Sequence, residues 1–342
     1  MNSLVLMNPA LIITGNTFVL SLSMQAWRPL SLGQRRAVFK SRINSYQTGV
    51  ALITVLLVLA LATVTVVSMS SERQLDIRRT ENHIRNDQAW VHVQSLESWA
   101  MQRLQADDAA NLAEIRLDEI GTVKLHGVIN DLQDRINLNN LLVDGQQSQE
   151  DVRRLQRLLK QLKLPVELTD AILDWLDADS DIRYPEGAED EFYTRLNPPY
   201  RSGNRLFGDV SELLLVKGVT PQIFQTLRPY ITAVDSYAPI NVNTAKPEIF
   251  RCLADDLSKD RAESMYRAAG KPFAKLEGFL QDEALNDSGI GKYGLTVASR
   301  FYVLAGTVDM GKVKIQFESY LSKDKAGKAA LIRRVRNGWQ HG

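Results

Sequence analysis

The sequence predicts an α+β fold, in which a long N-terminal helix packs against an antiparallel sheet and a large, mostly helical domain is inserted into that sheet. Two observations support this prediction. The uncharged apolar run 50–69 is followed by no glycine or proline until residue 121, so nothing in the sequence interrupts a helix that begins there. Segments typical of strands lie near both ends of the chain, at 125–141 and 302–336, whereas the region between them has helical periodicity.

The composition is that of a folded chain with a core large enough for two domains. Of its 342 residues 44% are hydrophobic, and a formal net charge of +1 with a pI of about 7.8 shows no charge excess suited to nucleic acid. The one cysteine, Cys252, excludes an intramolecular disulfide and a metal site built by the chain on several cysteines.

The apolar run Val50–Met69 carries no charge, glycine or proline. About 20 helical residues at about 1.5 Å each cross the roughly 30 Å hydrocarbon core of a bilayer, so the run predicts one membrane-spanning helix. The preceding residues are basic and the following ones have mixed charge, so the positive-inside rule places the N-terminus in the cytoplasm and residues 71–342 outside. The basic residues are Arg28, Arg35, Arg36, Lys40 and Arg42.

Gly49 lies directly before this apolar run, and polar residues precede it. A glycine in this place, followed by an apolar helix that continues into an amphipathic one, resembles the processing site of a type IV prepilin. We therefore expect prepilin peptidase to cleave after Gly49 and to leave Val50 as the mature N-terminus. An uncleaved signal anchor is the alternative, whereas an ordinary secretory signal has a shorter apolar region of about 7–15 residues.

The fifth position of the expected mature chain is Thr54. In the pilin family that this N-terminus resembles, that position is usually glutamate, whose carboxylate neutralises the α-amine of a neighbouring subunit inside an apolar bundle. A buried carboxylate without a partner is costly, so a subunit with no neighbour above it has no use for the acid. A simple membrane anchor would lack it as well.

An apolar stripe continues along the expected helix beyond the membrane, at spacings of three, four and seven residues. Packing against the chain's own globular domain accounts for most of this stripe, and packing against helices of other subunits accounts for a part near the membrane. The stripe contains Ile77, Ile84, Val91, Val93, Leu96, Ala100 and Leu104.

Three stretches in the middle of the chain have the order found in the K minor pseudopilins of type II secretion. They are RINLNNL at 135–141, a long acidic stretch at 172–220, and PINVNTAKPEIF at 239–250. With the N-terminal run they cover much of the mature chain, which therefore resembles this family. The resemblance implies a pilin-like fold with a helical insertion, anchored by one helix in the bacterial inner membrane with its C-terminal domain in the periplasm.

The same resemblance implies a place and a role. The subunit would lie at the tip of the pseudopilus, start its assembly and support the export of folded proteins across the outer membrane. A bulky helical insertion agrees with a tip position, because it obstructs lateral packing inside a thin filament. The implied partners are the I and J minor pseudopilins, the inner-membrane secretion platform, prepilin peptidase and secreted cargo.

Carboxylates gather in a loop of the middle region that also contains proline and glycine. Asp177, Asp179 and Asp181 alternate with uncharged residues, and further acids follow up to residue 191. Acids so closely spaced repel one another unless a cation lies among them, and oxygen ligands favour Ca²⁺ over Zn²⁺. The stretch departs from an EF-hand loop, because Ile182 stands where the sixth-position glycine is needed.

The resemblance to K pseudopilins also implies a structural calcium ion in this loop. Such an ion would order the chain and perform no chemistry. A surface of solvated acids is the alternative. The candidate ligands are Asp177, Asp179, Asp181, Glu189 and Asp190.

Two segments, 211–230 and 240–253, have the pattern of helix-hairpin-helix halves, which in some proteins bind DNA phosphates through backbone N–H groups. Lys217 and Arg228 are the only bases near the first hairpin, so we expect a packing module rather than a nucleic-acid site. The alternative functions are a signal-anchored envelope protein that binds DNA through these motifs, and a minor pilin of a type IV pilus.

The sequence GIGKYG at 289–294 matches the GxGxxG pattern of dinucleotide-binding loops. That function needs a strand before the motif and a helix after it, whereas the residues that follow are strand-like, so we expect a turn. The histidines have no partners at catalytic or metal-binding spacing, and no phosphate-binding GxxxxGK[ST] occurs. We expect no enzymatic activity.

These observations divide the chain into five parts. They are a cytoplasmic leader at 1–49, the transmembrane half of the N-terminal helix at 50–70, the rest of that helix with the first strands at 71–145, the helical insertion at 146–290, and the C-terminal strands at 291–342. The leader is long for a prepilin, and translation from Met24 would omit residues 1–23.

Overall fold

The computed structural model describes residues 47–106, 114–120, 123–255, 257–266, 272–286 and 288–336. The predicted basic leader, with its alternative start at Met24, lies outside these ranges. The chain divides into two compact units, residues 1–71 and 72–342, and each is described by itself.

The first unit contains the apolar part of helix α1, which as a whole runs from Gln47 to Gln105. The side chains between Val50 and Met69 are exposed, and the helix is long and apolar enough to cross a membrane. The hydroxyls of Thr54 and Thr65 donate to carbonyl oxygens of the same helix at 2.9 and 2.8 Å, so neither needs a partner outside it. A candidate transmembrane helix is thus present where the sequence predicts one, and the same helix continues to Gln105.

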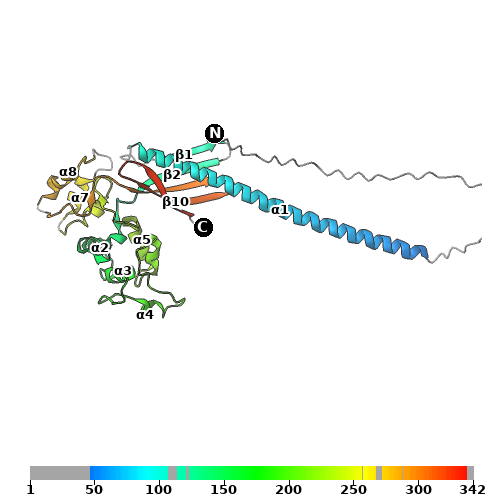
Figure 1. Cartoon of the computed structure of the whole chain (residues 1–342), viewed down its shortest axis with the longest axis horizontal. Helices are drawn as coiled ribbons and strands as arrows, with labels where there is room; N and C mark the ends of the chain where they lie inside the picture. The colour runs from blue at the N-terminus through cyan, green and yellow to red at the C-terminus, as the bar shows by residue number, and fades with distance from the viewer. Residues whose placement is uncertain are drawn as a thin grey trace, which may run out of the picture. The chain divides into compact units, whose positions relative to one another are not determined.

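The second unit contains one five-stranded sheet in which all neighbouring strands are antiparallel, in the order β1-β2-β9-β10-β11. Strands from the first and last parts of the chain therefore form one sheet, as predicted (Figure 1). Residues of β2 alternate between buried and more exposed positions, which is the pattern of a sheet with one covered face. The strands are β1 Glu114–Ile120, β2 Val123–Asp131, β9 Phe301–Asp309, β10 Lys314–Lys323 and β11 Ala329–Arg336.

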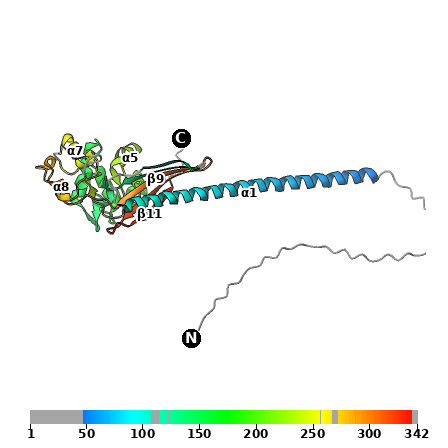
Figure 2. The same cartoon turned by 90° about the horizontal axis from the view of Figure 1, so that it is seen from above.

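The C-terminal half of α1 covers one face of this sheet (Figure 2). Its buried residues are spaced by three or four, so they form a single stripe that meets strands β2, β9 and β10. The stripe predicted to pack inside the chain is buried, whereas Ile77, Ile84 and Val91 are more than half exposed. The buried residues of the stripe are Ala89, Val93, Leu96, Ala100 and Leu104.

Two glycines make room for this packing in the middle of the sheet. Gly127 in β2 and Gly306 in β9 are directly opposite each other. A Cβ atom on Gly306 would lie 2.3 Å from the ring of Phe317, which is buried between the sheet and α1. A side chain at this position would therefore displace a large core residue.

A mostly helical domain occupies the chain between the end of β2 and the start of β9, residues 132–300. This is wider than the predicted insertion, 146–290, because 136–147 and 295–296 form short elements of the helical domain and not strands of the main sheet. Its helices are η1 Leu138–Leu141, α2 Gln149–Gln161, α3 Leu168–Leu176, α4 Asp190–Tyr193, η2 Val210–Leu215, α5 Pro221–Leu227, η3 Arg228–Tyr230, α6 Pro247–Phe250, α7 Lys259–Met265, α8 Leu276–Leu280 and η4 Glu283–Leu285; its strands are β3 Ile136–Asn137, β4 Leu142–Val143, β5 Gln146–Gln147, β6 Ile231–Thr232, β7 Ile240–Asn241 and β8 Leu295–Thr296.

The RINLNNL stretch holds the helical domain together through buried amide side chains. Asn137 accepts a hydrogen bond from Val234 N at 2.9 Å, and Asn140 accepts one from Ala238 N at 3.0 Å. Asn139 donates to the carbonyl oxygen of Phe207 at 3.0 Å. These side chains bond to backbone groups that would otherwise be buried without partners, which explains why the stretch has several asparagines inside a core.

Asp131 joins the main sheet to the helical domain. Its Oδ2 accepts hydrogen bonds from Ser299 Oγ and Thr244 Oγ1, both at 2.5 Å, and its Oδ1 accepts one from Gln133 N at 2.7 Å. Burial raises the pKa of this carboxyl, although the hydrogen bonds oppose the shift. The side chain of the last residue of β2 is therefore bonded to three separate segments of the inserted domain, one of which directly precedes β9.

Candidate metal centre

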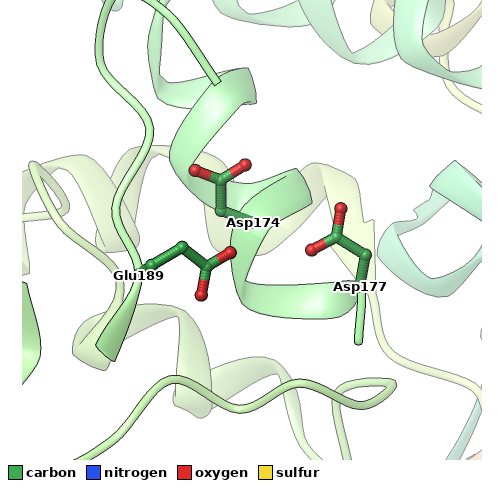
Figure 3. A group of neighbouring side chains, drawn as sticks. All are labelled: Asp174, Asp177 and Glu189. Atoms are coloured by element: carbon green, nitrogen blue, oxygen red, sulfur yellow. The ribbon is translucent and has the colours of Figure 1, made fainter. Parts of the chain in front are cut away.

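The candidate metal centre lies at the C-terminal end of α3 and the N-terminal end of α4. The apolar side chains of α3 are buried in the core of the helical domain, which fixes the orientation of this helix. Asp174 lies one turn before Asp177, so both carboxylates lie on the same side of the helix end. Glu189 directly precedes α4 and reaches the same place from the opposite side (Figure 3).

The three side chains converge on one point. One carboxylate oxygen from each of Asp174, Asp177 and Glu189 lies within 4.8 Å of the others. The exposed fractions of these residues are 0%, 5% and 3%, so water does not screen their mutual repulsion.

Arg183 supplies positive charge to two of the three acids. Its Nη1 donates to Asp174 Oδ1 at 2.7 Å and also to Asp177 Oδ2, and its backbone N–H donates to Asp174 Oδ2 at 3.1 Å. Gly187 passes so close that a Cβ atom there would lie 2.2 Å from Asp174 Oδ2. The loop thus needs a glycine at this position in order to close over the cluster.

Glu189 has no such partner. Both of its carboxylate oxygens, and Oδ1 of Asp177, are buried without a hydrogen-bond donor among the described residues. Burial, followed by the charges of Asp174 and Asp177, raises the pKa of Glu189 to about 7, and burial also raises the pKa of Asp177. A buried carboxylate without donors is costly, so this cluster favours the binding of a further cation.

The residues present fit a calcium ion. Its ligands are oxygen atoms at about 2.3–2.6 Å, so ligand atoms on opposite sides of one ion are separated by roughly 5 Å. The spacing of the three carboxylates agrees with this distance. Oxygen-only donors also exclude the thiolate and imidazole sets typical of structural zinc.

Two of the five predicted ligands, Asp177 and Glu189, lie in this cluster, and three lie outside it. Asp179 and Asp181 are exposed on the loop, where Asp179 Oδ1 accepts a hydrogen bond from Asp181 N at 2.9 Å. Asp190 accepts one from Ser202 N at 2.8 Å. Alternation along the sequence did not bring the acids together, because the loop after α3 directs successive side chains to different sides.

Asp174 is the member of the cluster that the sequence analysis missed. It lies within an apolar helical stretch and outside the run of alternating acids. Its spacing of three residues from Asp177 was the available signal, because that spacing places two helical side chains on one face.

The first helix-hairpin-helix segment is bound to this loop through its lysine. Lys217 Nζ lies 3.2 Å from Glu186 Oε2 and 3.4 Å from Gly187 O, and Lys217 N donates to Tyr193 Oη at 3.2 Å. The hairpin turns at Gly218, whose φ of +82° favours glycine. Lys217 is therefore paired with the acidic loop, and of the two bases near this hairpin Arg228 is the exposed one.

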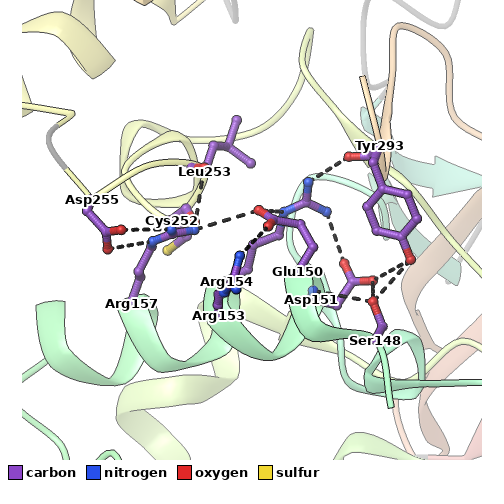
Figure 4. A network of polar contacts seen from close by, with 10 residues as sticks. All are labelled: Ser148, Glu150, Asp151, Arg153, Arg154, Arg157, Cys252, Leu253, Asp255 and Tyr293. Atoms are coloured by element: carbon purple, nitrogen blue, oxygen red, sulfur yellow. Dashed lines mark hydrogen bonds and ion pairs between the residues drawn. The ribbon is translucent and has the colours of Figure 1, made fainter. Parts of the chain in front are cut away.

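Two other sequence features, the GIGKYG motif and Cys252, have structural roles in a polar network around α2 (Figure 4). Gly294, the last glycine of GIGKYG, has a φ of +65°, and a Cβ atom there would lie 2.2 Å from Arg154 Nη1. The motif ends in a turn at 293–294, directly before the short strand β8, as predicted. Cys252 is buried, and burial raises the pKa of its thiol to about 12. Its carbonyl oxygen accepts a hydrogen bond from Arg157 at 3.2 Å.

The predicted processing site lies in the first turn of α1. Gly49 has no other group within 4 Å of the place where a Cβ atom would stand, and Val50 is 63% exposed. Thr54 is neutral and hydrogen-bonded within its own helix. The fifth position of the expected mature chain therefore has no charge to offer a neighbouring subunit.

Comparison with known proteins shows similarity to one family. Residues 134–236 match the family model for the type II secretion system (T2SS), protein K. The protein named type II secretion system protein K of Pseudomonas aeruginosa is 31% identical over 311 residues, which cover 84% of this chain and 92% of that protein. The protein of the same name from Aeromonas hydrophila is 31% identical over 329 residues, which cover 85% of this chain and 98% of that protein.

The fold also matches a solved structure. A chain in the GspK-GspI-GspJ complex from the type 2 secretion system of enterotoxigenic Escherichia coli aligns with a TM-score of 0.66 and 20% sequence identity. The alignment covers 76% of this chain and 100% of that chain. The fold of the aligned part of this chain therefore occurs in a known protein.

Proposed function

The chain belongs to the type II secretion system protein K family and is a membrane-anchored minor pseudopilin, and we propose that it occupies the tip of the pseudopilus and starts its assembly. The observation that carries this proposal is the helical domain of residues 132–300, inserted between two central strands of the sheet. A domain of this size obstructs the close lateral packing of subunits along a thin filament but not at its end.

The neutral residue at the fifth position supports the same place. A subunit inside an apolar helix bundle gains from a carboxylate that neutralises the α-amine of its neighbour, because an unpaired buried charge is costly. A subunit with no neighbour above it has no α-amine to neutralise, and Thr54 carries no charge. Domain size and this residue are independent features that favour the tip.

The partners proposed for this chain are the I and J minor pseudopilins, because the matched solved chain lies in a complex of those three proteins. We propose further contacts with prepilin peptidase at Gly49 and Val50, with the inner-membrane secretion platform and with secreted cargo. The N-terminus would lie in the cytoplasm and the second unit in the periplasm. The role would be structural, without an enzymatic reaction, in the export of folded proteins across the outer membrane.

We also propose that Asp174, Asp177 and Glu189 bind one structural calcium ion. The unpartnered oxygens of Glu189 support this, because an ion among the three carboxylates would neutralise charge that the described residues leave uncompensated. When bound, the ion supplies positive charge that holds α3, the acidic loop and α4 together.

The test of the proposed function uses the full-length chain expressed with and without prepilin peptidase and purified from membranes. Intact-mass and N-terminal analysis are expected to show a peptidase-dependent start at Val50. Co-expression with tagged I and J pseudopilins is then expected to recover a three-protein complex. A chain that keeps residues before Gly49 in both strains, or that fails to join I and J after cleavage, would contradict the proposal.

A further inference from the structure

We propose that Arg183 is a built-in competitor of the calcium ion: its guanidinium holds the acidic cluster together when no ion is present and leaves the cluster when the ion binds. This inference rests on the proposed calcium site. It assigns to Arg183 the role of setting the affinity of the site and of keeping the loop folded without metal.

The contacts of Arg183 place its guanidinium on carboxylate oxygens of two of the three proposed calcium ligands. Nη1 bonds to Asp174 Oδ1 at 2.7 Å and to Asp177 Oδ2, two of the three acids in the cluster. An ion bonded to the same two oxygens at about 2.3–2.6 Å would overlap Nη1 and repel its charge. The guanidinium and the ion therefore exclude each other at these ligands.

The guanidinium leaves Glu189 unsatisfied, which gives the ion its advantage. Neither Glu189 oxygen has a donor among the described residues, although the three carboxylates lie within 4.8 Å of one another. Nη1 of Arg183 bonds to both Asp174 and Asp177 and does not donate to the third acid. A spherical ion at the centre contacts all three carboxylates, so the cluster favours the ion once it is available.

Arg183 has a route out of the cluster that leaves the loop in place. Its side chain is 27% exposed, whereas that of Asp174 is 0% exposed, so the guanidinium can move into solvent while the acids stay buried. The backbone N–H of Arg183 remains bonded to Asp174 Oδ2, and Gly187 N remains bonded to Arg183 O at 2.8 Å. Exchange of the two cations therefore requires rotation of one side chain and no unfolding of the loop.

The test compares full-length wild-type protein in detergent with the variant Arg183→Gln. Calcium binding is measured by isothermal titration calorimetry, and thermal unfolding is followed in EDTA and in saturating calcium. We expect Arg183→Gln to bind calcium about tenfold to a hundredfold more tightly, the range of a charge-assisted hydrogen bond removed from the ion-free state only. We expect its Tm to fall in EDTA and to equal that of wild type in saturating calcium.

Arg195→Gln is the matched control, because Arg195 forms an exposed ion pair with Glu191 and its loss changes the net charge equally. We expect its calcium Kd to stay within about twofold of wild type, as for a screened surface charge. Arg183→Lys keeps a cation but lacks the fork of donors, and we expect a Kd between those of wild type and Arg183→Gln.

The competitor role is refuted if wild type binds calcium but Arg183→Gln binds it no more tightly, or if the variant lowers the Tm equally with and without calcium. Arg183 would then be a permanent member of the site. If neither protein shows a heat of calcium binding or a calcium-dependent Tm, the calcium site itself is refuted, and this inference is refuted with it.

Discussion

Two glutamates, one packed against the sheet and one in the helical domain, are equally buried but differ in their hydrogen-bond partners. Glu97 on α1 and Glu189 before α4 are both 3% exposed. Glu97 accepts hydrogen bonds from Ser319 Oγ at 2.5 Å and from Arg334 at 2.7 and 2.5 Å, whereas Glu189 has no donor among the described residues. The chain completes the first environment by itself. In the second environment Arg183 bonds to Asp174 and Asp177 but leaves Glu189 without a donor, which is the physical basis for proposing a ligand there.

The largest expected effect is at Glu97. The variant Glu97→Ala removes the partner of Arg334 and of the buried Ser319 hydroxyl, so we expect a loss of about 3 kcal/mol or more in the free energy of unfolding, with or without calcium. Denaturant unfolding with and without calcium measures it.

The control for Glu97 is Glu81→Ala, which removes an exposed ion pair with Arg85 on the same helix. Its free energy of unfolding should match that of wild type. A loss of stability at Glu97 no larger than that of the control would show that its hydrogen bonds to Ser319 and Arg334 do not stabilise the fold.

The next effect is at Glu189 and depends on calcium. Glu189→Gln removes one ligand of the proposed ion, and at a calcium concentration of 100 times the wild-type Kd we expect it to lose most of a stabilisation of about 2.7 kcal/mol. In EDTA we expect it to be as stable as wild type or more stable, because it removes an unpartnered buried charge. Thermal unfolding in both buffers measures this. An equal loss of stability in calcium and in EDTA would contradict the role of Glu189 as a calcium ligand.

The third effect is at Arg154, a buried charge of the helical domain for which the chain supplies hydrogen-bond partners. Arg154 is 3% exposed and bonds to Asp151 at 3.0 Å and to Tyr293 O at 2.6 Å, in the space left by Gly294. Gly294→Ala would push against Arg154 in addition to straining a residue at positive φ. We expect it to be less stable than the Gly289 control by about 1–3 kcal/mol.

Gly289→Ala is that control, because Gly289 has a similar φ, +66°, and no group within 4 Å of its added Cβ atom. Gly289→Ala therefore strains the backbone to a similar extent but makes no contact with Arg154. Equal unfolding free energies for Gly294→Ala and Gly289→Ala would show that the space beside Arg154 does not matter.

The smallest expected effect concerns Asp131, which is intermediate between the two glutamates because the described part of the chain gives it hydrogen-bond donors but no cation. Burial raises its pKa, so the folded chain holds this proton more tightly than the unfolded chain. Wild-type stability from this group therefore falls as the pH rises above the unfolded-state pKa near 4 and towards the higher folded pKa. Asp131→Asn does not titrate.

The stability of Asp131→Asn relative to wild type should therefore increase between pH 4 and pH 7. Urea unfolding of both proteins across this range measures the difference, in which the contributions of all other groups cancel. A difference that is constant with pH, or that changes in the opposite direction, would contradict the raised pKa.

The sheet and the membrane helix were predictable because their signals are local. The strand-like range predicted at 302–336 contains the strands Phe301–Asp309, Lys314–Lys323 and Ala329–Arg336 apart from one residue, and an unbroken apolar run marked the apolar part of α1. The boundary of the insertion was less predictable. Residues 136–137 have the apolar character of a strand, but they pair with 231–232 in the helical domain and not with the main sheet.

The family, the apolar anchor helix, the antiparallel sheet and the presence of an acidic loop beside a helix follow from the order of residues along the chain. Which acids meet is a property of the folded chain, because convergence depends on the path of the loop and not on spacing along it. That path leaves Asp179 and Asp181 in solvent, brings Asp174 and Glu189 together, and inserts Arg183 between two of the buried carboxylates.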